Sequence, residues 1–139
     1  MSRRESREAA MKLLFQYDFQ KDDLEELIKL FFENDAEFVV GDIENDYVLN
    51  VARGVVENIE EIDRLIEINS KGWKLSRMPR VDIAILRVAV YEMLYRKDIP
   101  ASVSINEAVE VAKRYSNPDA GIFINGILAS VFTECCSNG

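Results

Sequence analysis

Residues 123–126, "FING", combine an aromatic ring, an amide and a glycine on one predicted helix. An exposed ring can stack on an unpaired base, which contributes about 1–3 kcal/mol, and an amide can read a base edge. The helical period places Phe123 about 90° from the core stripe of that helix and Ile122 opposite the stripe. Gly126 fits a close approach, because a glycine inside a helix otherwise costs about 1 kcal/mol. Phe123 and Asn125 therefore predict either a site for single-stranded nucleic acid or packing against a second bundle or a second copy.

Two sets of arginines have the chemistry to bind phosphate. Arg87 lies in the most apolar segment of the chain, and Arg80 precedes it on nearly the same helical face. A guanidinium there either pairs with an internal carboxylate, the commoner outcome, or emerges in a groove and takes a phosphate through two hydrogen bonds. Near the N-terminus, Arg3 and Arg7 are one turn apart. They either belong to a frayed, soluble N-terminus or, because the helix dipole disfavours cations at this end, indicate an anionic partner.

The chain lacks the residues of common metal and catalytic sites. Histidine is absent, and the two cysteines, Cys135 and Cys136, are adjacent. This excludes zinc-ligand spacing and a disulfide framework, and it removes the commonest general base. We therefore expect no metal, no cofactor and no enzymatic activity. No apolar run approaches the roughly 20 residues that cross a bilayer, so we expect a cytoplasmic protein with no membrane contact.

The elements that position these residues are predicted to be helices throughout. Apolar residues recur with helical spacing, no strand-like alternation exceeds a few residues, and 139 residues suffice for one domain. The helix from about 79 to 97 is apolar nearly all round and should be central. The third predicted helix could split at Gly54 or within 57–63. The predicted helices cover about residues 4–19, 23–32, 43–70, 79–97, 104–115 and 120–134.

Polar residues mark where several of these helices should begin. Asp42, at the end of a predicted loop over 33–42, and Asp119 are expected to cap the helices that follow them. Ser104 and Glu107 have the spacing of a capping box, in which a hydroxyl and a carboxylate satisfy reciprocal backbone donors. The core stripe of the last helix is predicted to consist of Ile124, Ile127, Leu128 and Val131.

Charge is segregated along the chain. The net charge is −8, yet residues 22–68 hold fifteen acidic and three basic side chains, whereas residues 69–100 hold seven basic and three acidic ones. Residues 1–21 are also basic on balance. An acidic protein does not coat nucleic acid non-specifically, but a local basic face can still bind RNA selectively.

Three segments together resemble the NusB family of bacterial transcription antitermination factors. They are "RRESREAAMKLLFQ" near the start, "MPRVDIAILRVAVYEMLYRKDIP" in the middle and "VSINEAVEVAKRYSNPDAGIFINGIL" near the end. The resemblance implies an all-α fold of two three-helix bundles in one domain, about residues 1–70 and 71–139. It also implies binding to boxA RNA of ribosomal RNA leader transcripts jointly with NusE, a ribosomal protein, within the RNA polymerase antitermination complex.

The resemblance also implies which residues make contacts. The RNA contacts would be Arg3, Arg4, Arg7, Arg87, Phe123 and Asn125, and the NusE contacts would be Asp82, Tyr91 and Glu92. Some family members form homodimers that hide the RNA surface. Two alternatives stay open: a similar helical module of a ribosomal RNA cytosine methyltransferase system, and a structural helical dimer without an RNA role.

Overall fold

The computed structural model describes residues 2–20, 23–33 and 42–136, and every regular element among them is a helix. This confirms the all-α prediction. In chain order the helices are α1 Arg3–Gln20, α2 Leu24–Glu33, α3 Ile43–Glu57, α4 Ile59–Ile68, the short 3-10 helix η1 Leu75–Arg77, α5 Arg80–Tyr95, α6 Ala101–Tyr115 and α7 Pro118–Cys135.

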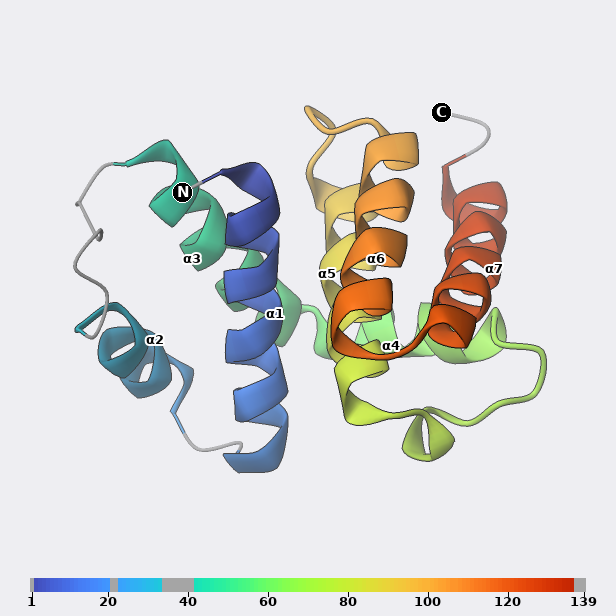
Figure 1. The fold of residues 1–139 in the computed structure, drawn as a ribbon, viewed down its shortest axis with the longest axis horizontal. Coiled ribbons are helices and arrows are strands. Elements are labelled where there is room, and N and C mark those ends of the chain that lie inside the picture. Colours follow the sequence, from blue (N-terminus) through green and yellow to red (C-terminus); the bar gives the residue numbers. More distant parts are fainter. Residues whose placement is uncertain (1, 21–22, 34–41, 137–139) are drawn as a thin grey trace.

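Helix α5 is the centre of the molecule, as its apolar sequence predicts. It packs against α1, α3, α4, α6 and α7, and its residues 82–93 are all buried. Helices α1, α2 and α3 lie on one side, while α6 and α7 lie with α5 on the other (Figure 1). One apolar core joins the two sides and includes Leu13, Leu14, Val51, Val55, Leu86, Val90, Ile124 and Leu128.

The long apolar segment after residue 43 does split into two helices. Helix α3 ends and α4 begins around Asn58, whose backbone N–H is bonded to the carbonyls of Gly54 and Val55. Helix α4 then packs against α5 and α7 as well as α3. A bundle boundary near residue 70, as the sequence suggests, remains an interpretation, because α4 contacts helices on both sides of it.

The cap at Asp42 is confirmed. Its Oδ1 accepts hydrogen bonds from the backbone N–H groups of Glu44 at 2.9 Å and Asn45 at 3.2 Å. These are two of the donors that the start of any helix leaves without an internal partner. Of the predicted loop over 33–42, residues 34–41 lie outside the described residues, and Glu33 is the last residue of α2.

Two other predicted helix starts are wrong. Helix α6 begins at Ala101, so Ser104 lies within its first turn and its hydroxyl is used elsewhere, while Glu107 pairs with another helix. Helix α7 is capped by Asn117, whose side-chain oxygen accepts from the N–H of Ala120, and Asp119 lies inside the first turn. In both cases a proline at or next to the cap moves the start toward the N-terminus, because its fixed φ suits a first turn.

Candidate nucleic-acid interface

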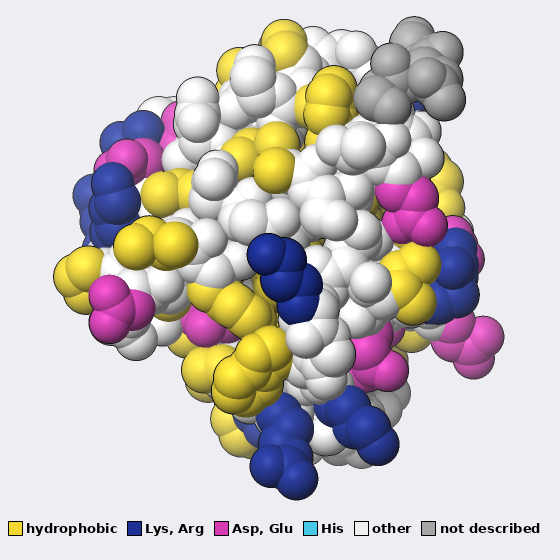
Figure 2. All heavy atoms as spheres, turned by 90° about the vertical axis from the view of Figure 1, so that its right-hand side faces the viewer, with side chains coloured by type: hydrophobic (Ala, Val, Ile, Leu, Met, Phe, Trp, Pro, Cys, Tyr) yellow, Lys and Arg dark blue, Asp and Glu magenta, His cyan; other side chains and the backbone are white. Residues whose placement is uncertain are grey.

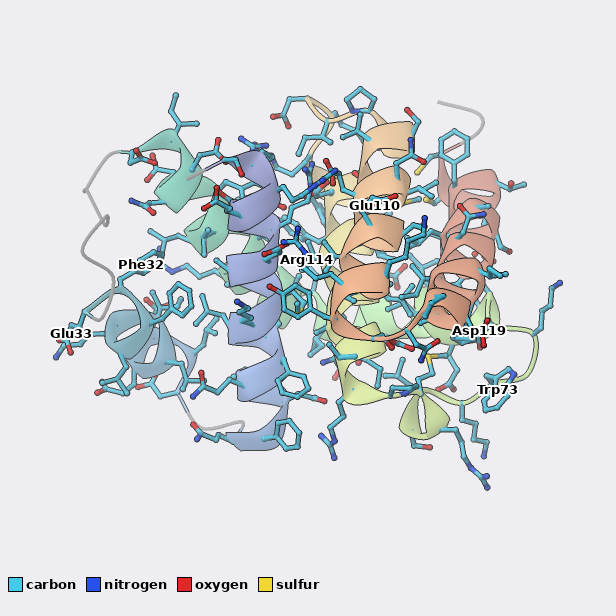
Figure 3. The ribbon with its side chains drawn as sticks, in the orientation of Figure 1. Phe32, Glu33, Trp73, Glu110, Arg114 and Asp119 are labelled. Carbon is cyan, nitrogen blue, oxygen red and sulfur yellow. The ribbon has the colours of Figure 1, made fainter. Side chains whose placement is uncertain are left out.

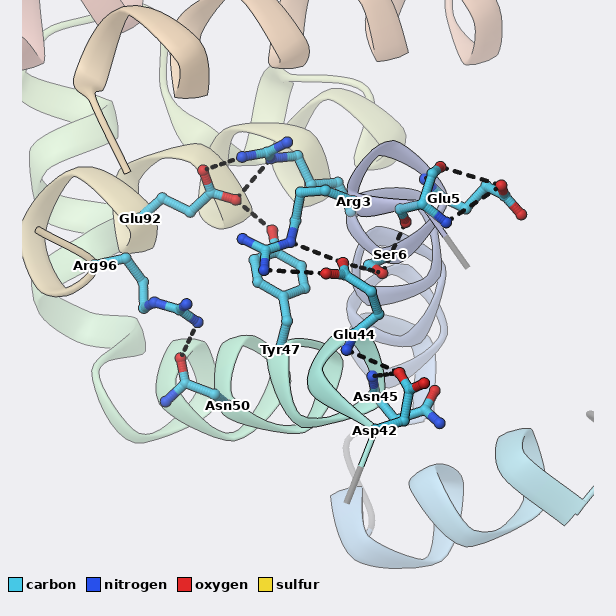
Figure 4. A network of polar contacts seen from close by, with 12 residues as sticks. Arg3, Glu5, Ser6, Asp42, Glu44, Asn45, Tyr47, Asn50, Glu92 and Arg96 are labelled. Carbon is cyan, nitrogen blue, oxygen red and sulfur yellow. Dashed lines mark hydrogen bonds and ion pairs between the residues drawn. The ribbon is translucent and has the colours of Figure 1, made fainter. Parts of the chain in front are cut away.

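Glu92 of α5 is the centre of a buried polar network that joins α5 to α1, α3 and α6. Figure 4 shows its contacts with α1 and α3. Arg7 of α1 donates two hydrogen bonds to its carboxylate, at 2.8 and 3.1 Å. Ser104 of α6 donates a third at 2.7 Å, and the hydroxyl of Tyr47 of α3 donates a fourth. Glu92 is 0% and Arg7 6% exposed, so neither charge reaches solvent.

The electrostatics of the network fix its protonation state. Burial alone would lower the pKa of Arg7, but the hydrogen bonds and charge of Glu92 more than offset burial and leave that pKa raised. Burial, and after it the Glu92 carboxylate, raise the pKa of Tyr47. Arg7 therefore stays charged and Tyr47 stays a neutral donor. Through Glu92, the network links α1 to α3, α5 and α6.

Arg87 pairs with internal carboxylates, which is one of the two outcomes that the sequence left open. Its guanidinium donates two hydrogen bonds of 2.9 Å to Asp63 of α4 and one of 3.2 Å to Asp18 of α1. It is 5% exposed. Like Arg7, it gives its donors to carboxylates of the chain itself and presents none to a phosphate. The RNA contacts predicted for Arg7 and Arg87 are untested, and in this structure both side chains bind other helices.

The residues predicted to meet NusE are also mostly interior. Glu92 is enclosed, and Asp82 is buried with one carboxylate oxygen, Oδ1, lacking a hydrogen-bond partner among the described residues. Burial raises the pKa of Asp82. The ring of Tyr91 packs over Gly54 of α3, and its hydroxyl donates a hydrogen bond of 3.3 Å to Asn50 Oδ1. Tyr91 borders an open hollow of about 380 Å³ between α3 and α5.

The N-terminal arginines Arg3 and Arg4 are on the surface. Arg3 pairs with Glu44 at 2.8 Å and lies over the Tyr47 ring, with 30% of its side chain exposed. Arg4 pairs with Glu107 of α6 at 2.8 Å and has 49% of its side chain exposed. Arg4 is the more accessible of the two, because the carboxylate partners of both are equally exposed, at 21%, but Arg3 also packs on the Tyr47 ring.

The exposed side of α7 agrees with the helical period. The predicted stripe of Ile124, Ile127, Leu128 and Val131 is buried, Ile122 is 76% exposed, and Phe123 is half-buried. Asn125 and Gly126 are exposed. A methyl group added at Gly126 would meet no atom within 4 Å, so no part of the described chain makes the close approach that a helical glycine allows.

Basic residues at the end of α6 lie between α1 and α7, and the sequence analysis did not single them out. Arg114 donates to Glu8 of α1 at 2.6 Å, and Figure 3 shows it between α1 and α6. The side chain of Lys113 extends over Gly121 of α7, where an added Cβ would lie 3.7 Å from its Cγ. With Arg4 they line a hollow of about 330 Å³. The signal available in the sequence was the "KRY" that ends a predicted helix.

Comparison with known proteins identifies the family. The model of the NusB family matches residues 4–133. The chain belongs to the NusB family. Its relatives include the transcription antitermination protein NusB of Acetivibrio thermocellus, 54% identical over 94% of this chain and 88% of the relative. NusB of Ruminiclostridium cellulolyticum is 47% identical over the same shares.

Solved structures of NusB have the same fold. T. maritima NusB superposes with a TM-score of 0.87 at 38% identity, covering 96% of this chain and 92% of the other. A structure of antitermination factors NusB and NusE in complex with double-stranded RNA has a TM-score of 0.84 at 26% identity, covering 96% and 99%. The NusB family is one of transcription antitermination proteins, as the sequence indicated, and its members are not enzymes. The methyltransferase alternative is therefore not favoured.

Proposed function

We propose that this chain is a transcription antitermination factor that binds boxA RNA of ribosomal RNA leader transcripts together with NusE, as part of the RNA polymerase antitermination complex. Membership of the NusB family supports this function, and so does the related structure that contains NusB, NusE and RNA. The observation that carries the RNA role is the exposed side of α7, where Phe123 and Asn125 face outward beside an unoccupied approach at Gly126.

The proposed RNA surface combines cations with a stacking ring. Arg3 and Arg4 of α1 neutralise phosphates, and Phe123 and Asn125 of α7 stack on and read a splayed base. A half-buried ring suits a single-stranded base, because base pairs in a duplex keep their faces stacked on each other. Arg114 is added from the geometry, because it lies between α1 and α6 in the hollow that Arg4 also lines.

Arg7 and Arg87 serve this surface indirectly in the proposal. Each is held by carboxylates inside the protein, so each positions α1 or α5 rather than touching phosphate. For NusE, the open hollow between α3 and α5 is the proposed contact, because Tyr91 lines it together with Asn50 and Arg53. Asp82 and Glu92 are buried and do not touch NusE in this proposal; they affect the contact only by holding α5, which carries Tyr91, in place.

A second copy of the chain is the alternative partner for the same side of α7. Ile122 is 76% exposed next to Phe123, which is the kind of apolar surface that self-association covers. Because one surface cannot hold RNA and a second copy together, the two would compete, and RNA would favour the monomer.

The test is a fluorescence-anisotropy titration of a labelled boxA-like single-stranded RNA, with and without NusE, at two salt concentrations. We expect salt-sensitive binding that tightens with NusE and weakens about 10-fold or more in Phe123→Ala. Phe132→Ala is the matched control, since Phe132 is a partly exposed aromatic residue toward the other end of α7. Equal affinities for the two variants would remove Phe123 from the site. No binding by wild-type protein with NusE would overturn the proposed function.

A further inference from the structure

The segment between α4 and α5 has a fixed conformation. Lys71 and Gly72 both adopt positive φ, 54° and 89°, which is uncommon for a lysine. The Ser70 hydroxyl lies within hydrogen-bond distance of the carbonyl oxygens of Glu67 and Trp73. The Glu67 carboxylate accepts from the N–H of Leu75 at 2.8 Å. This turn is therefore pre-organised, and the Glu67 carboxylate is bonded to the backbone of the segment.

The segment holds the only tryptophan of the chain on the surface. Trp73 is 55% exposed, and its indole N–H has no hydrogen-bond partner among the described residues. Its ring meets Phe123 edge to face, with centroids 6.4 Å apart and planes at 77°. Such a contact occupies one face of one ring, so it leaves aromatic faces open to a stacked base. Figure 3 shows Trp73 beside the start of α7, near Asp119.

The cations around Trp73 differ from the other basic residues. Lys71, Lys74 and Arg77 are exposed, and together with Gly72 and Trp73 they line a hollow of about 320 Å³. None of the three forms an ion pair among the described residues, whereas every other described arginine pairs with a carboxylate. Figure 2 shows Lys and Arg side chains gathered beside hydrophobic ones at the lower end of this side of the molecule. Free cations next to an open aromatic ring fit a polyanion that also has planar groups.

We propose that residues 71–77, the Trp73 segment, continue the RNA surface beyond Phe123. A further base of the single-stranded RNA stacks on Trp73, and the adjoining phosphates are neutralised by Lys71, Lys74 and Arg77. This inference rests on the proposed RNA-binding function and adds a second stacking position to it. A membrane or an acidic peptide would use the cations but would give the exposed indole beside Phe123 no planar group to stack on.

Because Trp73 is the only tryptophan, its fluorescence reports on this segment alone. The experiment titrates single-stranded boxA-like RNA into the full chain with NusE and follows labelled-RNA anisotropy and Trp73 emission together. We expect emission to be quenched along the same saturation curve as the anisotropy. We expect Trp73→Leu to weaken binding about 10-fold, and Trp73→Phe, which keeps a ring, to restore most of it.

The cations are tested by salt dependence. Replacing Lys71, Lys74 and Arg77 together by alanine should lower the slope of log K against log salt by about 2, since each phosphate contact on a single strand contributes about 0.7. Arg64→Ala is the control, because Arg64 is an exposed arginine of α4 already paired with Glu61. Circular dichroism checks that each variant keeps its helices.

The outcomes separate this inference from the function beneath it. RNA binding without quenching of Trp73, and with unchanged affinity in Trp73→Leu, would overturn the second stacking position and leave the proposed function intact. An unchanged salt slope in the triple variant would remove the cations from the RNA path. No RNA binding by wild-type protein with NusE would overturn both proposals.

Discussion

At the scale of single residues, Glu92 is the most completely buried charged side chain among those that the structure describes. It is fully buried and holds the charge of Arg7. We expect Glu92→Gln to lower the free energy of unfolding by about 3–5 kcal/mol, because it leaves a buried guanidinium without its counter-charge. Urea denaturation measures this. The matched control is Glu61→Gln, which removes an exposed pair with Arg64 and should change stability by less than about 1 kcal/mol. Equal effects would mean that Arg7 finds solvent or another partner.

Asp82 should make stability depend on pH. Burial raises its pKa in the folded protein, so ionisation is disfavoured in that state relative to the unfolded chain. The cost is present above the folded pKa and disappears as pH falls below the unfolded value. We expect Asp82→Asn to raise the free energy of unfolding at pH 7 by about 1 kcal/mol relative to wild type. This is the lower end for a buried polar group, because a hydrogen bond with Ser116 and the helix dipole both favour the carboxylate. Unfolding at pH 7 and pH 3.5 tests this, and a difference that does not shrink at low pH would contradict it.

The sequence identified Phe123 by periodicity alone, because the position of a side chain around a helix depends only on local spacing. It could not decide the partner of Arg87. Asp63 and Asp18 are 24 and 69 residues away in the chain, and only tertiary packing brings them to its guanidinium. The partner of Arg7 could not be identified for the same reason, since Glu92 is 85 residues away in the chain. Lys113 and Trp73 were missed because they are distinguished only by their neighbours on α7, Gly121 and Phe123, which tertiary packing brings to them.

At the scale of the helix, we expect the substitution of glycine by alanine to have opposite effects on stability at two positions. Gly54 of α3 lies under the Tyr91 ring, with which a Cβ would overlap, whereas a Cβ at Gly126 of α7 would enter open space. We expect Gly54→Ala to destabilise the fold by about 1–3 kcal/mol, since the ring must move. Gly126→Ala should stabilise it by up to about 1 kcal/mol, through helix propensity. Thermal unfolding of both variants measures this, and a destabilised Gly126→Ala would reveal a contact at that position.

Element boundaries were predicted well where a local signal acts alone. Asp42 caps α3 as expected, because an aspartate before an apolar helix has no competing role there. Ser104 shows the limit: its hydroxyl donates to Glu92, a residue on another helix, so its resemblance to a capping box was coincidental. The hydrogen bond to Glu92 therefore takes the Ser104 hydroxyl that the local sequence pattern had assigned to a helix cap.

At the scale of the whole molecule, α2 is the least supported helix. It packs chiefly against α1, whereas α5 is enclosed by helices on several sides. We expect amide hydrogens of α2 to exchange at least about 100-fold faster than those of α5, because local opening of α2 breaks few contacts. Hydrogen exchange followed by mass spectrometry resolves the two segments. Equal protection of α2 and α5 would mean that both open only when the whole protein unfolds.

The unequal pairing of the basic residues also affects how fast the protein finds a polyanion. Described arginines outside the Trp73 segment are neutralised by the chain's own carboxylates, and most acidic residues lie within 22–68. The unpaired Lys71, Lys74 and Arg77 therefore form a local positive area on an acidic protein. Because that area attracts a polyanion before contact, higher ionic strength should slow association much more than it changes the rate of dissociation.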